Sequence, residues 1–357
     1  MYYDLFTVFE SVIWLYRILG CYPYVLREYD DARKYILSPF SVTFNILLFI
    51  IGTKYFVVYA DTVINNYDLN SDSLGIMTLG VRQFSNMICV FDSTIVKIFH
   101  SGKILRSINS LYSVDEELKN LGYHFNYRLA VRTVPICLIA FLTSMYLFIN
   151  TEFLLLVDLP IPSLMRLFGN SMILLQMANI TLFSFLITNV GFRLKALNAS
   201  LENLTDHPLN FQVIMVNNKK PEDIVHTSAK IHARLCEVAK LLNGAFVLTI
   251  VTSVVQAFVI STAMLYFIFI EFKTGLANEF LIMMPYLTML LICVLVVLVI
   301  VLSCNWTSSQ IAGTAKILHQ MSLKKMCMDD KSLDEMRKKK FQLGKMITLA
   351  YDKDQPV

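Results

Sequence analysis

The side chains that could do chemistry in this chain are polar and aromatic residues within long apolar stretches. We take five of them as the candidate ligand-binding site: Arg82, Tyr146, Asn170, Tyr266 and Tyr286. Placing an ionisable side chain inside a bilayer costs about 2.5–3.5 kcal/mol on insertion scales, so such residues are candidates for function. These five are predicted to share a depth in the outer half of a helical bundle. Their mixture of a cation, an amide and phenol rings suits a small organic ligand that enters from outside.

Several of these polar residues also have a structural interpretation. Arg82 can extend to the outer headgroups or pair with Asp72 in the preceding loop. Arg166 and Asn170 are four residues apart, so they share one helix face, where interhelical hydrogen bonds are common. Gln176, further along the same stretch, has the same interpretation.

Other polar residues are more typical of helix packing than of a ligand site. Asp92 lies near the inner end of its apolar stretch, where it is expected to pair with a basic side chain at the cytosolic edge. Pro285 is expected to break the last stretch beside Tyr286. Four residues at helical spacing form one polar face that favours helix–helix contacts: Thr249, Thr252, Ser253 and Gln256.

Motifs for enzymatic chemistry are absent from the sequence. It contains no phosphate-binding loop, no HExxH and no GxSxG. Seven cysteines and six histidines occur, but none has metal or disulfide spacing. We therefore expect no enzyme, no cofactor and no metal site.

The elements that must position these residues are membrane-spanning helices. The 357 residues are 56% hydrophobic and 16% charged, whereas about a quarter of the residues of a soluble domain are charged. Continuous apolar runs of about 20 residues predict an all-α polytopic membrane protein rather than a β-barrel. Six spans are predicted, at about 38–60, 74–98, 129–150, 163–191, 243–270 and 279–303.

The loop charges predict the orientation of these spans, because Lys and Arg resist translocation. The second and fourth loops are rich in basic residues, whereas the first and third contain none. The N-terminus is therefore expected in the cytosol of a multi-pass plasma-membrane protein. The net charge of +4 follows from this one-sided distribution, so lipid and not nucleic acid is the expected surrounding.

The predicted domains follow from the spans. Residues 1–37 form a cytosolic segment, and residues 38–303 form the six-span domain with its cytosolic loops 99–128 and 192–242. Residues 304–357 form a cytosolic tail. The even loops lack helix breakers over long stretches, so helical extensions beyond the membrane are expected. The exception is 205–225, which contains two prolines and is expected to be a flexible loop.

Three stretches resemble insect gustatory receptors, seven-span chemoreceptors with a cytosolic N-terminus. They are "YRILGCYPY" before the first span, "HARLCEVAKLLNGAFVLTIVTSVVQAFVISTAMLYFIF" around the fifth, and "SCNWTSSQIAGTAKILHQM" after the sixth. The resemblance implies a taste receptor subunit of a ligand-gated cation channel, built as a homo- or hetero-tetramer. A small-molecule tastant would be its ligand.

The resemblance also implies a seventh span that lines the pore. The stretch "KKKFQLGKMITL" resembles the approach to that span, and "AYDKDQPV" follows it. "MITLA" is far shorter than the roughly 20 residues needed to cross a bilayer. The sequence therefore carries a second expectation, in which this form does not conduct alone and acts as a partner of full-length subunits.

The loop charges make a direct prediction about topology. Epitope tags fused to either end of the expressed chain should stain only after permeabilisation, because both flanks belong to the basic, cytosolic side. Staining of either tag on intact cells would show that the orientation is wrong.

Overall fold

A computed structural model describes the chain in six continuous stretches, together with scattered helical positions between residues 39 and 92 and at residue 143. These longer stretches are 24–29, 32–37, 99–121, 163–206, 221–274 and 280–328, and the helical positions before residue 92 include the short run 49–54. Side chains in the fourth stretch are described from Gln176 to Glu202.

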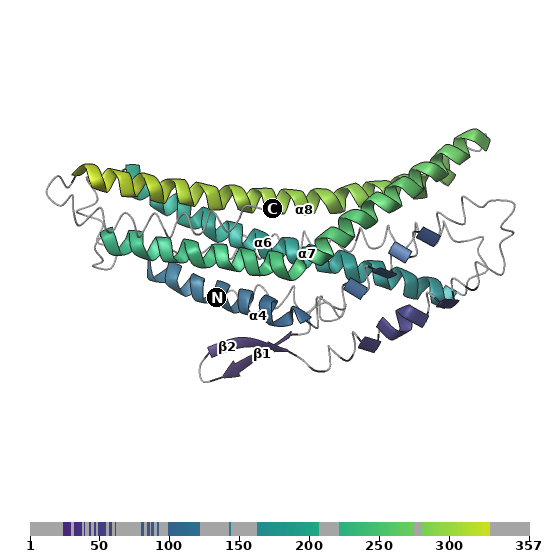
Figure 1. The fold of residues 1–357 in the computed structure, drawn as a ribbon, viewed down its shortest axis with the longest axis horizontal. Coiled ribbons are helices and arrows are strands. Elements are labelled where there is room, and N and C mark those ends of the chain that lie inside the picture. Colours follow the sequence, from purple (N-terminus) through teal and green to yellow (C-terminus); the bar gives the residue numbers. More distant parts are fainter. Residues whose placement is uncertain are drawn as a thin grey trace. The chain divides into compact units, whose positions relative to one another are not determined.

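The described elements are four helices and one hairpin (Figure 1). Strands β1 (Tyr24–Tyr29) and β2 (Ala32–Leu37) precede helices α4 (Ser101–Asn120) and α6 (Ser163–Asp206). Helices α7 (Pro221–Thr274) and α8 (Phe280–Met328) follow. The helical class predicted from the sequence is confirmed for these four segments.

The hairpin is the departure from a strictly all-α fold. Its strands pair antiparallel, from Tyr24 opposite Leu37 to Tyr29 opposite Ala32. Both strands carry aromatic and branched aliphatic side chains, which favour extended backbone. The sequence analysis assigned residues 1–37 to the cytosolic side without a secondary structure, so it missed this element.

The long helices run further than a membrane requires, and α7 begins earlier than the sequence predicts, because 221–225 is helical although 205–225 is expected to be a flexible loop. Pro221 starts α7, which suits proline because the first N–H groups of a helix have no partner within it. The 54 residues of α7 extend about 80 Å, whereas the hydrocarbon core is about 30 Å thick. Long helical extensions on the fifth and sixth predicted spans are therefore confirmed.

Three of the described helices are long and apolar enough to cross a membrane. They contain the segments Gln176–Glu202, Asp223–Lys273 and Tyr286–Met321. The predicted span 129–150 apart from residue 143, about half of 38–60 and most of 74–98 lie outside the described residues.

Pro285 does not break α8, contrary to the prediction. The helix is continuous from Phe280 to Met328. Because Pro285 lies in its second turn, the missing N–H removes only one hydrogen bond close to an end where unpaired N–H groups are normal. The hydroxyl of Thr288 also donates to the carbonyl oxygen of Met284 at 2.8 Å, within the same turns.

The chain forms two compact units. Unit 1 comprises residues 1–105, 126–184 and 243–302. Unit 2 comprises residues 106–125, 185–242 and 303–357. The three domains predicted from the sequence stay a prediction.

The core of unit 1 is an apolar cluster between α7 and α8. Its buried members are Ala257, Ile260, Ala263, Met264, Met289, Ile292 and Cys293. Outward-facing positions on the same helices are also apolar, with the side chain of Phe258 73% exposed and that of Leu291 58%. Exposed apolar faces of this extent are expected of helices that meet lipid or other subunits.

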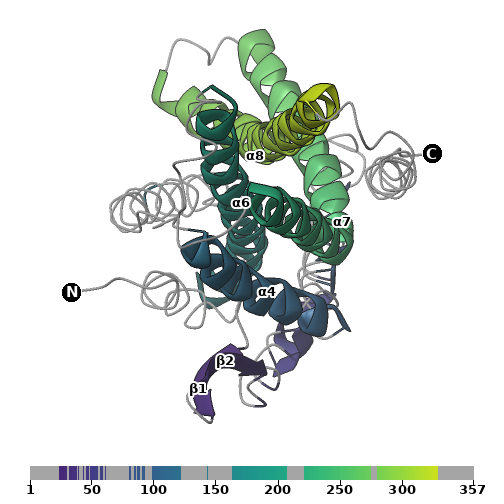
Figure 2. The same cartoon turned by 90° about the vertical axis from the view of Figure 1, so that its left-hand side faces the viewer.

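The core of unit 2 is built from apolar rows on segments that lie side by side (Figure 2). Each row repeats every three or four residues, which places its members on one helix face. On α4 the row includes Ile108, Leu111 and Leu118, and on α7 it includes Ile231, Leu235, Val238 and Leu242.

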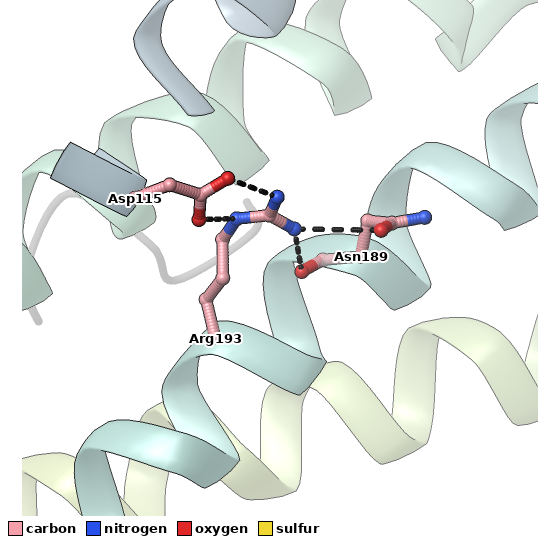
Figure 3. Close-up of polar contacts among 3 residues, drawn as sticks. All are labelled: Asp115, Asn189 and Arg193. Atoms are coloured by element: carbon pink, nitrogen blue, oxygen red, sulfur yellow. Dashed lines mark hydrogen bonds and ion pairs between the residues drawn. The ribbon is translucent and has the colours of Figure 1, made fainter. Parts of the chain in front are cut away.

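A buried ion pair joins α4 to α6 in unit 2 (Figure 3). The guanidinium of Arg193 donates from Nε to Oδ1 of Asp115 at 2.7 Å and from Nη2 to Oδ2 at 2.8 Å. Its Nη1 donates to the backbone oxygen of Asn189 at 2.8 Å. The side chain of Arg193 is fully buried, so this two-armed contact replaces the hydration that the cation has lost.

This ion pair predicts a double-mutant result. Arg193→Met should lower the free energy of unfolding by about 3–5 kcal/mol, because Asp115 is left buried without its cation. The double variant Arg193→Met with Asp115→Leu should recover most of the loss, since no charge remains. Chemical unfolding of the purified chain measures both. A double variant no more stable than the single one would contradict this explanation.

Gly191 allows α6 and α8 to approach closely in unit 2. A Cβ atom there would lie 2.7 Å from Cε3 of the Trp306 ring, and closer still to Cζ3. The same ring meets Phe192 edge-on, with 4.9 Å between centroids. The hydroxyl of Thr307 donates to the backbone oxygen of Ile187 at 3.0 Å across the same contact. A side chain at position 191 would therefore push the two helices apart.

Two glycine substitutions test this contact. Gly191→Ala should destabilise the chain by about 1–3 kcal/mol, because rigid ring atoms occupy the space. Gly244→Ala is the matched control, since a Cβ there meets nothing within 4 Å. It should be neutral or stabilise by up to about 1 kcal/mol, as alanine favours helix. Equal melting temperatures for the two variants would show that the contact does not limit packing.

Candidate functional site

Two of the five candidate residues meet in an aromatic row in unit 1. Tyr266 contacts Phe267 edge-on, with 5.6 Å between ring centroids. Phe267 stacks on Tyr286, with 5.8 Å between centroids and 22° between planes. The row joins α7 to α8, and Phe267 and Tyr286 pack against the apolar core of unit 1. These rings offer a flat apolar surface with phenol groups at its edges.

A small cavity lies in the same apolar core, between α6, α7 and α8. Its lining residues are Gln176, Met177, Ile180, Ser253, Gln256, Ala257, Ile260, Met289, Ile292, Cys293 and Val296. Each helix contributes residues spaced three or four apart, which is the pattern of one helix face. The cavity volume is about 30 Å³, room for one or two water molecules. A ligand larger than water therefore requires the helices to separate.

The cavity wall contains two amides, of Gln176 and Gln256, and the hydroxyl of Ser253, which bonds the first of them. Gln176 Nε2 of α6 donates to Ser253 Oγ of α7 at 2.8 Å. Ser253 in turn donates to the backbone oxygen of Thr249. The other atom of the amide, Gln176 Oε1, is buried without a hydrogen-bond partner. It can therefore accept a hydrogen bond from a hydroxyl or amine placed in the cavity.

The predicted ligand-binding role of the five candidate residues stays a prediction, and two of them are placed by the described structure. Tyr266 and Tyr286 share the aromatic row. Arg82 and Tyr146 lie outside the described residues, and the side chain of Asn170 in α6 does too, so their parts in the site stay predictions. The interhelical hydrogen bond predicted for Gln176 is confirmed.

Phe267 is the residue that sequence reasoning missed. It sits in the run "YFIF", where an aromatic ring is indistinguishable from ordinary apolar packing. Its position next to Tyr266 does not mark it as a site residue either. Adjacent residues on a helix point about 100° apart and are not expected to line the same site.

A second pair of reactive side chains lies on α7 in unit 2. Cys236 Sγ and His232 Nε2 are 3.6 Å apart, one helical turn from each other. The stretch around them carries Lys230, Arg234 and Glu237, so it belongs to the polar extension of α7 and not to its apolar span. No third metal-binding side chain joins them within the described part of the chain. The pair alone does not make a metal site.

Burial lowers the pKa of His232 from 6.5 to about 4. The folded chain therefore keeps this imidazole neutral, and its Nδ1 is buried without a hydrogen-bond partner. Unfolding restores the ordinary pKa, so the unfolded chain binds an extra proton between these two values.

This shift predicts a loss of stability on acidification. Above about pH 6.5 His232 is neutral in both the folded and the unfolded chain, so it costs no stability. Between pH 6.5 and about 4 the unfolded chain takes up a proton that the folded chain does not, so the free energy of unfolding falls. At pH 5 the loss should reach about 2 kcal/mol. Unfolding curves of wild type and His232→Phe between pH 7.5 and pH 5 measure it as a difference in slope, because the variant has no group to protonate there. Parallel curves would contradict the assignment.

Comparison with known families identifies the class of this protein. The sequence pattern of the family described as "7tm Chemosensory receptor" matches residues 9–339. The chain therefore belongs to the 7tm chemosensory receptor family. This membership is consistent with the resemblance to insect gustatory receptors and makes the chain a chemoreceptor of the membrane rather than a member of an enzyme family. No curated protein matches the chain.

Proposed function

We propose that the chain is a gustatory receptor subunit that binds small tastants from outside the cell. We further propose that it assembles as a homo- or hetero-tetramer in the plasma membrane, where the tetramer is a ligand-gated cation channel. The family match supports the receptor class. The observation that carries the ligand proposal is the cavity in unit 1, whose wall contains an unused hydrogen-bond acceptor, Gln176 Oε1.

The proposed binding mode uses the chemistry of unit 1. A small polar organic molecule would occupy the cavity and donate a hydrogen bond to Gln176 Oε1. The aromatic row lies about two turns beyond the lining residue Ile260 on α7, so Phe267 and Tyr286 would line the route by which the ligand enters. Because the cavity is small, the ligand would separate α7 from α8 in order to enter. A ligand that binds one arrangement of the helices better than another shifts the population toward it, which is what gating requires.

Binding can be measured separately from conduction. A panel of tastants is added to the purified chain, and the unfolding midpoint reports binding as a ligand-dependent rise. Once a ligand is found, Gln176→Leu should weaken its affinity about tenfold, since it removes a contact of about 1.4 kcal/mol, whereas Phe267→Ala, on the entry route, should weaken it much less.

Phe258→Ala is the matched control for this experiment. Its ring lies on α7, is mostly exposed and lines no part of the cavity, so its removal should leave the affinity unchanged. Equal effects of all three substitutions would contradict the proposed site. Evoked current in oocytes then tests the channel proposal, and binding without current would favour the non-conducting partner that the sequence also suggested.

A further inference from the structure

The carboxylate of Asp92 is buried in unit 1 and forms no ion pair within contact distance among the described residues, although His100 lies near enough to interact with its charge. Asp92 is 1% exposed, and its Oδ1 has no hydrogen-bond partner. Its Oδ2 accepts a hydrogen bond from the hydroxyl of Thr252 on α7 at 3.1 Å. The sequence predicts a pairing with a basic side chain at the cytosolic edge, and that pairing stays a prediction, because residues 93–98 lie outside the described residues.

A second hydroxyl faces the same carboxylate. Thr249 precedes Thr252 by three residues and therefore lies on the same face of α7. It is 1% exposed, and its Oγ1 is buried without a hydrogen-bond partner. Its hydroxyl faces the carboxyl group of Asp92 closely enough to act on it, although the contact falls outside strict hydrogen-bond geometry. Two hydroxyl oxygens and two carboxylate oxygens thus share one buried space.

The two hydroxyl groups carry two hydrogens, which are fewer than the lone pairs on the four oxygens. Thr252 Oγ1 is within hydrogen-bond distance of Asp92 Oδ2, of the Leu248 carbonyl oxygen at 3.0 Å and of the Thr249 carbonyl oxygen at 3.2 Å. A hydroxyl has one hydrogen, so only one of these contacts can be a donation at a time. When the hydrogen bonds the helix backbone, the Thr252 oxygen presents a lone pair to the carboxylate.

The nearest described imidazole is already engaged elsewhere. His100 Nδ1 lies 3.0 Å from the backbone oxygen of Ala245, one turn before Thr249, a geometry that fits donation from Nδ1. That nitrogen is therefore not available to the carboxylate of Asp92.

We propose that Asp92, Thr249 and Thr252 bind a monovalent cation of the sodium class. Carboxylate and hydroxyl oxygens are ligands for hard cations, and a single carboxylate balances one positive charge. A divalent ion would usually take more carboxylates than this site provides. A proton on Asp92 would satisfy only one of the oxygens that face it, whereas a cation contacts several together.

Sodium-dependent stability tests this site. The unfolding midpoint of the purified chain is measured while sodium chloride replaces N-methyl-D-glucamine chloride at constant ionic strength. Sodium should raise the midpoint saturably by about 2–4 °C. The rise should be lost in Asp92→Asn and reduced in Thr252→Val, because each removes a ligand atom.

Thr262→Val is the matched control, because Thr262 lies on the same helix and its hydroxyl donates only to the backbone oxygen of Phe258 among the contacts described. It should keep the full sodium response. A wild-type chain that melts equally in both salts, or a response that persists in Asp92→Asn, would overturn the proposal; the first result would point to a proton on Asp92 instead. The readout is stability alone, so failure of the tastant proposal does not affect it.

Discussion

The bidentate contact between Arg193 and Asp115 is the interaction on which the packing of unit 2 depends. A guanidinium that is fully buried is tolerated only when its hydrogen-bond donors are met, and here a carboxylate from α4 and a backbone oxygen of α6 meet them. The geometry of this fork fixes the rotation of α4 against α6. The apolar rows of both helices then face inward, so charge placement and core packing agree.

A second ion pair extends this arrangement to α7. Arg234 Nη1 donates to Glu117 Oε1 at 2.6 Å and to Ser113 Oγ at 3.1 Å. Both partners lie on α4, close to Asp115. Acidic residues of α4 therefore form ion pairs with an arginine of α6 and an arginine of α7. Arg234 is partly exposed, which makes this pair weaker than the buried one. Unit 2 therefore contains one buried ion pair that fixes the orientation of two helices and one partly exposed ion pair that adds little stability.

The long helices could be predicted from the sequence, whereas the site could be predicted only in part. Long apolar runs define α7 and α8 because helical periodicity and length are local properties. The stacking of Phe267 on Tyr286 depends on the rotation of two helices, which no single segment encodes. The hydroxyl contact of Asp92 was missed for the same reason, since its partner is 160 residues away. The continuity of α8 through Pro285 was predicted wrongly because the cost of proline depends on its distance from the helix start.

The hydrogen bond between Gln176 and Ser253 has a consequence for biogenesis. Its two residues are 77 positions apart in the chain. At about 5–20 residues per second, a ribosome needs about 4–15 s to make the intervening stretch. During that interval the amide of α6 is synthesised but its partner helix is not. We expect α6 to remain beside the insertion machinery or a chaperone until α7 arrives, because an unpaired amide is poorly tolerated in lipid.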